Sequence, residues 1–170
     1  DIIGSLVAPV FYNVAIAENY PDWEDDPGGY EFVATIAGGI VLSEGMNMAE
    51  EGDLFAAFDA AGNVRSMSTQ LIPTFGPYTG EIIYELTLRS NAEGDLLSFK
   101  YYDISEDVVL NIAETYEFVI NDQIGNLIDP VFYNIVLPFV TLSFSHATAS
   151  SIDIEYESNA AIAGVQFLVT

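Results

Sequence analysis

Short segments in which apolar and polar residues alternate run through this chain and restrict the folds open to it. In residues 82–89, Ile82, Tyr84, Leu86 and Leu88 alternate with more polar side chains such as Glu85. Neighbouring side chains of a β-strand point to opposite faces, so this pattern predicts an antiparallel strand with one buried face. Turn residues separate such segments about every 8–12 residues, which predicts an all-β fold, an antiparallel, Ig-like or jelly-roll-like β-sandwich with little or no helix.

The segment boundaries follow from glycine, proline and asparagine. Strands are predicted at 5–17, 30–36, 54–59, 64–71, 82–89, 96–102, 108–112, 115–121, 131–144 with a break at Pro138, 152–157 and 162–169. The pair Gly38-Gly39 is expected to end the strand that begins at Tyr30. Residues 43–52 are expected to form a loop with at most one helical turn, because glycines interrupt their helical pattern.

One of the predicted strands occurs twice. Residues 3–14 return as residues 124–135 with eight of twelve positions identical, at an offset of 121 residues. Similar sequences fit similar surroundings, so the two copies are expected to occupy equivalent positions. The apolar side chains expected to make the contacts are Val10, Phe11, Tyr12 and Val14 in the first copy and Val131, Phe132, Tyr133 and Ile135 in the second.

The repeat divides the chain unequally. Residues 1–123 have the length of one sandwich, and only 47 residues follow from 124 onwards. Burial is marginal in units below about 60 residues. Residues 124–170 are therefore expected either to pack on the first module or to be completed by a strand from a neighbouring subunit. Strand exchange of the second kind is head-to-tail and propagates into a polymer unless it closes into a ring.

The charge balance excludes several partners. The chain carries 26 carboxylates against Arg65, Arg89 and Lys100, a net charge of −23. Nucleic acids and anionic membranes need clustered basic residues, so neither is expected as a partner. No apolar run approaches the roughly 20 residues of a membrane-spanning helix, so no membrane insertion is expected. The chain has no cysteine, which excludes disulfides and thiol chemistry.

Two groups of carboxylates are candidates for binding calcium. The first is the loop Asp22-Trp23-Glu24-Asp25-Asp26, in which alternate carboxylates of a tight loop could converge on one hard cation. The second is Glu50, Glu51 and Asp53. In each case a structural alternative stays open. If it binds no calcium, the loop is a solvated segment. The second group is then part of a turn that leads into a strand, because Glu51-Gly52-Asp53-Leu54 resembles Glu93-Gly94-Asp95-Leu96.

Sugar binding and catalysis have weaker candidates. Trp23, with Tyr20 and Tyr30 close by in sequence, could form an aromatic platform for a polysaccharide or could anchor its loop by packing down. His146 is the one histidine, and Ser143 and Ser145 lie near it, but nothing marks either serine as a nucleophile. The chain is therefore not expected to be an enzyme.

Three stretches carry a resemblance to a known group of proteins: Gly52-Asp53-Leu54-Phe55-Ala56-Ala57-Phe58-Asp59, Gly62-Asn63-Val64-Arg65, and Leu97-Ser98-Phe99-Lys100-Tyr101-Tyr102-Asp103, followed by Asn121, Gly125 and Pro130. Over about residues 50–135 they resemble tandem β-sandwich modules of secreted bacterial surface proteins. Residues 152–169 look like an early strand pair of a cohesin-like sandwich. The resemblance implies an extracellular spacer, adhesive or assembly module and carries over no catalytic residue.

The features together predict a non-catalytic structural subunit of an extracellular assembly. The subunit would be joined to its neighbours by β-strand addition. These neighbours would be further copies of the chain in a head-to-tail homopolymer, or adjacent modules, and calcium would stabilise the assembly. The alternative is a carbohydrate-binding or adhesive module of a secreted multidomain protein.

Overall fold

The computed structural model describes residues 20–137, 139–146, 148 and 153–159, and in this part of the chain it is all-β, as the alternation predicts. The strands are β1 (Phe32–Ser43), β2 (Met46–Asn47), β3 (Leu54–Phe58), β4 (Val64–Leu71), β5 (Ile83–Ser90), β6 (Leu96–Asp103), β7 (Val108–Glu117), β8 (Gln123–Ile124), β9 (Val131–Asn134), β10 (Val140–Ser145) and β11 (Asp153–Ser158).

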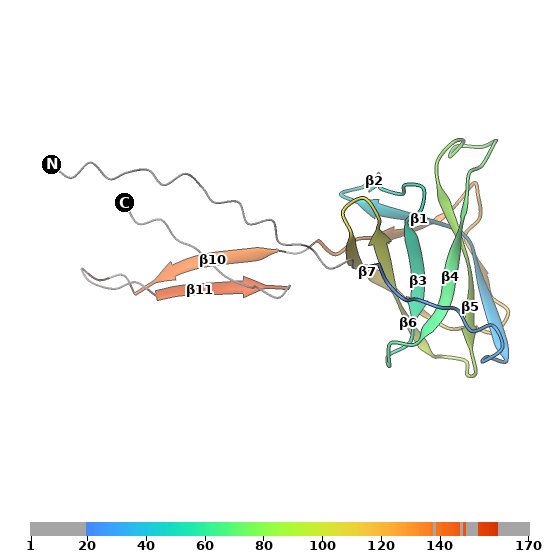
Figure 1. Ribbon diagram of the computed structural model, residues 1–170, viewed down its shortest axis with the longest axis horizontal. Coiled ribbons are helices and arrows are strands. Elements are labelled where there is room, and N and C mark those ends of the chain that lie inside the picture. Colours follow the sequence, from blue (N-terminus) through green and yellow to red (C-terminus); the bar gives the residue numbers. More distant parts are fainter. Residues whose placement is uncertain (1–19, 138, 147, 149–152, 160–170) are drawn as a thin grey trace.

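Nine of these strands form one curled sheet (Figure 1). Its order is β2-β1-β5-β4-β3-β6-β7, with antiparallel neighbours, and β8 and β9 run parallel to β1 on its other edge. The curl brings β7 close to the end of β9, where Ile112 forms an antiparallel bridge with Ile135. The sheet therefore nearly closes on itself, with β9 between β1 and β7.

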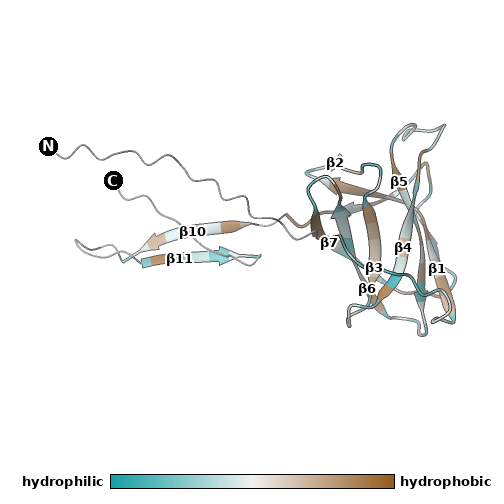
Figure 2. Cartoon of the chain, in the orientation of Figure 1, coloured by the Kyte–Doolittle hydropathy of each residue, from teal (hydrophilic) through white to brown (hydrophobic). Residues whose placement is uncertain are grey.

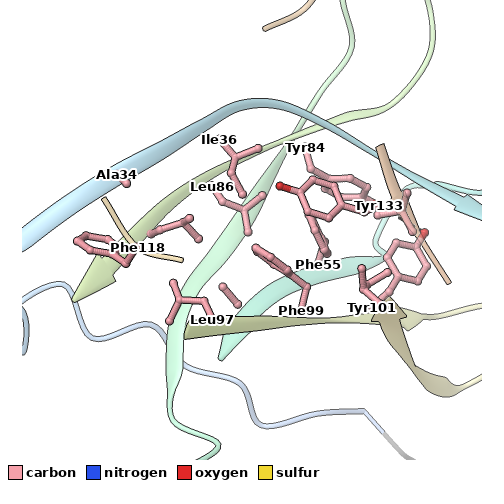
Figure 3. Packing of buried hydrophobic residues seen from close by; sticks show 14 of the residues in the cluster. Ala34, Ile36, Phe55, Tyr84, Leu86, Leu97, Phe99, Tyr101, Phe118 and Tyr133 are labelled. Atoms are coloured by element: carbon pink, nitrogen blue, oxygen red, sulfur yellow. Dashed lines mark hydrogen bonds between the residues drawn. The ribbon is translucent and has the colours of Figure 1, made fainter. Parts of the chain in front are cut away.

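The core fills the inside of the curl (Figure 3). Phe55 lies at its centre, with ring centroids 5.5 Å from those of Tyr84 and Phe99 and 5.0 Å from that of Tyr133. Tilted and edge-on ring pairs at such distances are favourable. The buried cluster consists of Ala34, Ile36, Val41, Phe55, Ala57, Tyr84, Leu86, Leu88, Leu97, Phe99, Tyr101, Ile112, Phe118, Tyr133 and Ile135.

Several sequence predictions are confirmed in detail. Tyr84, Leu86 and Leu88 of β5 are buried, and Glu85 between them is exposed. The β3–β4 hairpin turns between the strands predicted at 54–59 and 64–71, and Gly62 in this turn has a left-handed φ of +87°. In Figure 2 the apolar β3 contrasts with the paler, mixed β4 beside it.

Three boundary predictions are wrong. β1 continues through Gly38 and Gly39 to Ser43, because the glycine pair makes a register shift between Ile36 and Gly39 rather than an end. Residues 108–117 form one strand, not two, since a second register shift opposite Ser98 and Lys100 takes up the break. Met46–Asn47 is a short strand paired with β1, not a helical turn.

The remaining described strands, β10 and β11, form a separate two-stranded antiparallel sheet (Figure 1). The first repeat copy, residues 3–14, and the strand predicted at 162–169 lie outside the described residues.

Candidate functional site

The second repeat copy, residues 124–135, forms one wall of the sandwich. We call it the closing strand, and we call the space between β1 and β7 that it fills the groove. Gly39, Ile40, Val41 and Leu42 of β1 lie opposite Val131, Phe132, Tyr133 and Asn134, in parallel register. Backbone amides complete the contact on both sides of the groove. Ile135 N donates to Leu42 O at 2.9 Å, and Val136 N donates to Asn111 O of β7 at 2.8 Å.

The closing strand contributes directly to the core. Tyr133 is 2% exposed, and its ring centroid lies 5.0 Å from those of Phe55 and Phe99 (Figure 3). Burial raises the pKa of the Tyr133 hydroxyl, so this group is neutral at physiological pH. Ile135 is also buried, whereas Phe132, between the two, is 44% exposed. Tyr133 and Ile135 therefore hold the strand in the groove.

Two glycines allow the closing strand to approach β1. A Cβ at Gly38 would lie 2.4 Å from the Asn126 carbonyl oxygen, and a Cβ at Gly125 would lie 2.4 Å from the Gly38 carbonyl oxygen. Gly125 also has a φ of +68°, a left-handed conformation that glycine adopts without strain. A side chain at either glycine would therefore clash with the backbone of the other strand.

Polar contacts fix the ends of the closing strand. The Asn126 Oδ1 accepts hydrogen bonds from the amides of Ile128 and Asp129 and so shapes the turn before Pro130. The backbone N and the Nδ2 of Asn134 each donate to the Glu114 carboxylate of β7 at 2.7 Å. The sequence marks Asn134 only as part of the repeat, and nothing in it identifies Glu114 as its partner.

Residues 20–30, which we call the strap, cross the outer face of the sheet and turn at residues 27–29 (Figure 1). Its side chains alternate, so that Trp23 and Asp25 turn towards the sheet while Asp22, Glu24 and Asp26 are exposed. The Trp23 ring packs edge-on against Phe58 at 5.1 Å. This contact anchors the strap to β3, as expected for the structural alternative.

The three cations of the chain lie on the sheet face that the strap crosses. Arg89 donates to Asp25 Oδ2 at 2.5 Å, the Arg65 guanidinium stacks on Tyr30 at 4.4 Å, and Lys100 lies 5.0 Å from the centre of the Phe58 ring. One ion pair, one cation–π contact and the packing of Trp23 therefore hold the strap on the sheet, whereas Lys100 contacts β3 rather than the strap. The sequence signal for a segment that packs on the sheet is that Trp23 and Asp25 alternate with Asp22, Glu24 and Asp26 in a stretch otherwise typical of a loop.

Arg65 also binds Asp59, at the start of the β3–β4 turn, through its Nε and one terminal nitrogen. Burial alone would raise the pKa of Asp59. Hydrogen bonds from Asn63, Arg65 and Ala61 outweigh this effect and lower the pKa from its ordinary value of 3.8 to about 2. A carboxylate whose pKa is depressed in the folded state stabilises the fold above its unfolded pKa. This contribution is lost as the pH falls through the folded pKa.

We therefore expect Asp59→Asn to destabilise the protein at pH 7 and to have a progressively smaller effect between about pH 4 and pH 2. The measurement is the difference in the free energy of unfolding between variant and wild type across that range, since this difference cancels the titration of the other carboxylates. Asp22→Asn, on the exposed side of the strap, controls for the loss of one negative charge. A difference that stays constant down to pH 2 would contradict the assignment.

The second group of candidate ligands is split by the fold. Glu50 and Glu51 are exposed, whereas Asp53 is 4% exposed. The Asp53 carboxylate accepts hydrogen bonds from the amides of Glu50 and Ile104, at 2.8 and 2.9 Å, and a short one from the Tyr101 hydroxyl. Burial raises the pKa of Tyr101, which keeps this hydroxyl a donor. Asp53 thus ties the loop before β3 to the end of β6.

We expect Asp53→Ala to lower the free energy of unfolding by about 3 kcal/mol, because it removes these bonds and leaves buried donors without their acceptor. Urea denaturation measures the loss. Glu51→Ala, an exposed carboxylate in the same loop, is the matched control and should change stability by less than about 0.5 kcal/mol. Equal losses in the two variants would show that the hydrogen bonds of the buried Asp53 carboxylate add nothing to stability beyond what an exposed carboxylate adds.

The structure brings together few of the groups that a metal site or a catalytic site needs. Among the described residues, no three His, Cys, Asp or Glu side chains come close enough to hold a metal ion. His146 is exposed, and its Nδ1 lies 3.2 Å from the Asp153 carboxylate. Ser145 donates to Glu155 at 2.8 Å rather than to the histidine.

One open hollow of about 430 Å³ lies on the outer side of the closing strand. It is lined by Ile40, Leu42, Gly45, Asn47, Pro77, Tyr78, Glu81 and Phe132. Asn47 is held there by hydrogen bonds from its Nδ2 to Glu81 and to the Ile82 carbonyl. Aromatic rings beside amide and carboxylate groups are the side chains that could contact a sugar.

Comparison with known proteins returned nothing: no family model, curated protein or solved structure matches this chain. No helix long and apolar enough to span a membrane occurs among the described residues.

Proposed function

We propose that this chain is a non-catalytic structural module of an extracellular assembly, such as a filament, a tube or a surface array, in which neighbours are joined by β-strand addition. One observation carries the proposal. Residues 124–135 form one wall of the sandwich, and the chain holds a second segment at 3–14 that is identical to them at eight of twelve positions. A segment with the sequence of a sandwich strand is suited to complete another sandwich.

The β10–β11 sheet supports association with a neighbour. Val140, Leu142 and Phe144 lie on the same face as Ile154 and Tyr156 of the paired strand. Each of these five side chains is at least 40% exposed. A lone two-stranded sheet is marginally stable in water, and an exposed apolar face of this kind marks a contact surface. The resemblance of residues 50–135 to modules of secreted surface proteins supports an extracellular location.

Calcium is proposed to stabilise the assembly by neutralising exposed carboxylates such as Asp22, Glu24 and Asp26. The net charge of −23 makes mutual repulsion between neighbouring modules large. If calcium binds specifically, it should raise the melting temperature and promote assembly more than NaCl at the same ionic strength. Equal effects of the two salts would reduce its role to general screening.

The second candidate function is polysaccharide binding in a secreted protein, and the hollow beside Tyr78 and Phe132 favours it. Trp23 is a weaker candidate for the sugar platform than its sequence context indicates, because its ring already packs on Phe58. A glycan-binding screen of wild type, Tyr78→Ala and Trp23→Ala separates the two sites. The absence of binding to any polysaccharide would remove this function.

The test of the proposed function is electron microscopy and sedimentation of the purified chain, with and without calcium, before and after deletion of residues 1–16. We expect ordered polymers or defined oligomers from the full chain and their loss on deletion. A monodisperse monomer whose stability is unchanged by the deletion would contradict the proposal.

A further inference from the structure

The two repeat copies differ where the structure tolerates a difference. Only four of the twelve positions change, and three of them, occupied by Asn126, Ile128 and Asp129 in the closing strand, are exposed. The fourth pairs buried Ile135 with Val14, a change of one methylene group. The buried and half-buried positions before Ile135 are all identical between the copies.

The identical residues are those that make the contacts with the groove. Gly4 corresponds to Gly125, which the crossing with β1 requires to be glycine. Tyr12 corresponds to Tyr133, whose ring completes the core. Asn13 corresponds to Asn134, which binds Glu114 of β7. Residues 3–14 thus keep the glycine, tyrosine and asparagine through which the closing strand is held, with Val14 in place of Ile135 and Ser5 in place of Asn126.

The described chain offers one such groove for two such strands, and residues 124–135 fill it. Resting on the strand-addition function proposed above, we infer that residues 3–14 of one molecule bind the groove of a second copy, in the place and register of its residues 124–135. In that register Val10 lies opposite Gly39, Phe11 opposite Ile40, Tyr12 opposite Val41 and Asn13 opposite Leu42 of the second copy. The contact is heterologous, because the donor presents a strand and the acceptor presents a groove.

The competition between the two copies gives the test. Tyr133→Ala weakens the resident strand and opens the groove, and Tyr12→Ala weakens the incoming one. Occupation by a second molecule depends on concentration, whereas occupation by the molecule's own strand does not. We measure the melting temperature and the association constant of Tyr133→Ala, Tyr12→Ala and the double variant over a wide range of protein concentration.

We expect Tyr133→Ala to regain melting temperature and to associate as its concentration rises. The double variant should associate at least about tenfold more weakly and regain nothing. Tyr12→Ala alone should behave as wild type in thermal unfolding at low concentration. Val7→Ala in the Tyr133→Ala background is the matched control, since the equivalent Ile128 is 58% exposed, and it should leave the recovery intact.

Recovery that does not depend on Tyr12, recovery that does not depend on concentration, or no recovery at all would each overturn the inference. A Tyr133→Ala protein that stays unfolded at every concentration falls under the last outcome. The result is distinguishable from failure of the proposed function. Ordered assembly that survives Tyr12→Ala keeps the function and removes this site, whereas Tyr12-dependent recovery without native assembly keeps the site and removes the function.

Discussion

Phe55→Ala is expected to lower the free energy of unfolding by about 4 kcal/mol, enough to unfold a large share of a marginally stable domain. Phe55 is fully buried and contacts the rings of Tyr84, Phe99 and Tyr133, which come from β5, β6 and the closing strand. Truncation to alanine leaves a cavity between three strands that are paired to different neighbours. They cannot all move inwards to fill it.

Urea denaturation of wild type and variant measures the loss. Phe75→Ala is the matched control, because Phe75 is 61% exposed and its truncation removes the same atoms from the surface. We expect it to change stability by less than about 0.5 kcal/mol. A Phe55→Ala loss as small as that of the control would mean that the aromatic cluster is not the centre of the core.

Gly38→Ala is expected to cost about 3 kcal/mol, which is at the upper end of the usual range for overpacking. The added methyl carbon would lie 2.4 Å from the oxygen and 2.6 Å from the carbonyl carbon of Asn126. Both atoms belong to the backbone, so no side-chain rotation relieves the clash, and the closing strand has to move away from β1. The loss should therefore be accompanied by faster amide exchange in 124–135.

Gly28→Ala is the control for the general effect of adding a methyl group to a glycine. A Cβ at Gly28 would meet only Asp26 Oδ1, at 3.7 Å, an ordinary contact in the exposed strap. This variant should be neutral or slightly stabilising, because alanine restricts the unfolded chain. A Gly38→Ala protein as stable as Gly28→Ala would contradict the close crossing of the two backbones.

The sequence predicts most strands because their signal is local. Period-two alternation identifies β3, β4, β5 and β6 to within about one residue, since each has one face in the core and turn residues at its ends. Local reasoning fails at Gly38-Gly39, where the same dipeptide that ends many strands serves a contact with Gly125, nearly 90 residues away. It fails at β7 for a related reason, because a register shift looks in sequence like the end of a strand.

The candidate site was predictable in part. The repeat identifies residues 124–135 as important, and the structure places them in the first sandwich rather than in a second one. Three facts depend on pairing across the fold: that β9 runs parallel to β1, that Glu114 accepts hydrogen bonds from Asn134, and that the strap lies over the cations. A local sequence pattern cannot identify such partners, because they become neighbours only when the sheet curls.

The most direct measurement uses the absence of cysteine from the wild-type chain. Leu42 and Asn134 are partners on adjacent strands, so Leu42→Cys with Asn134→Cys should form an intramolecular disulfide, which serves as the reference. The test variant carries Leu42→Cys, Asn13→Cys and Tyr133→Ala, and the register control has Phe11→Cys in place of Asn13→Cys. If residues 3–14 of one molecule fill the groove of another, the test variant cross-links into covalent dimers and longer chains, and the register control does so much more slowly. A 13–42 bond formed only within one molecule, or cross-linking no faster than in the control, would contradict the account.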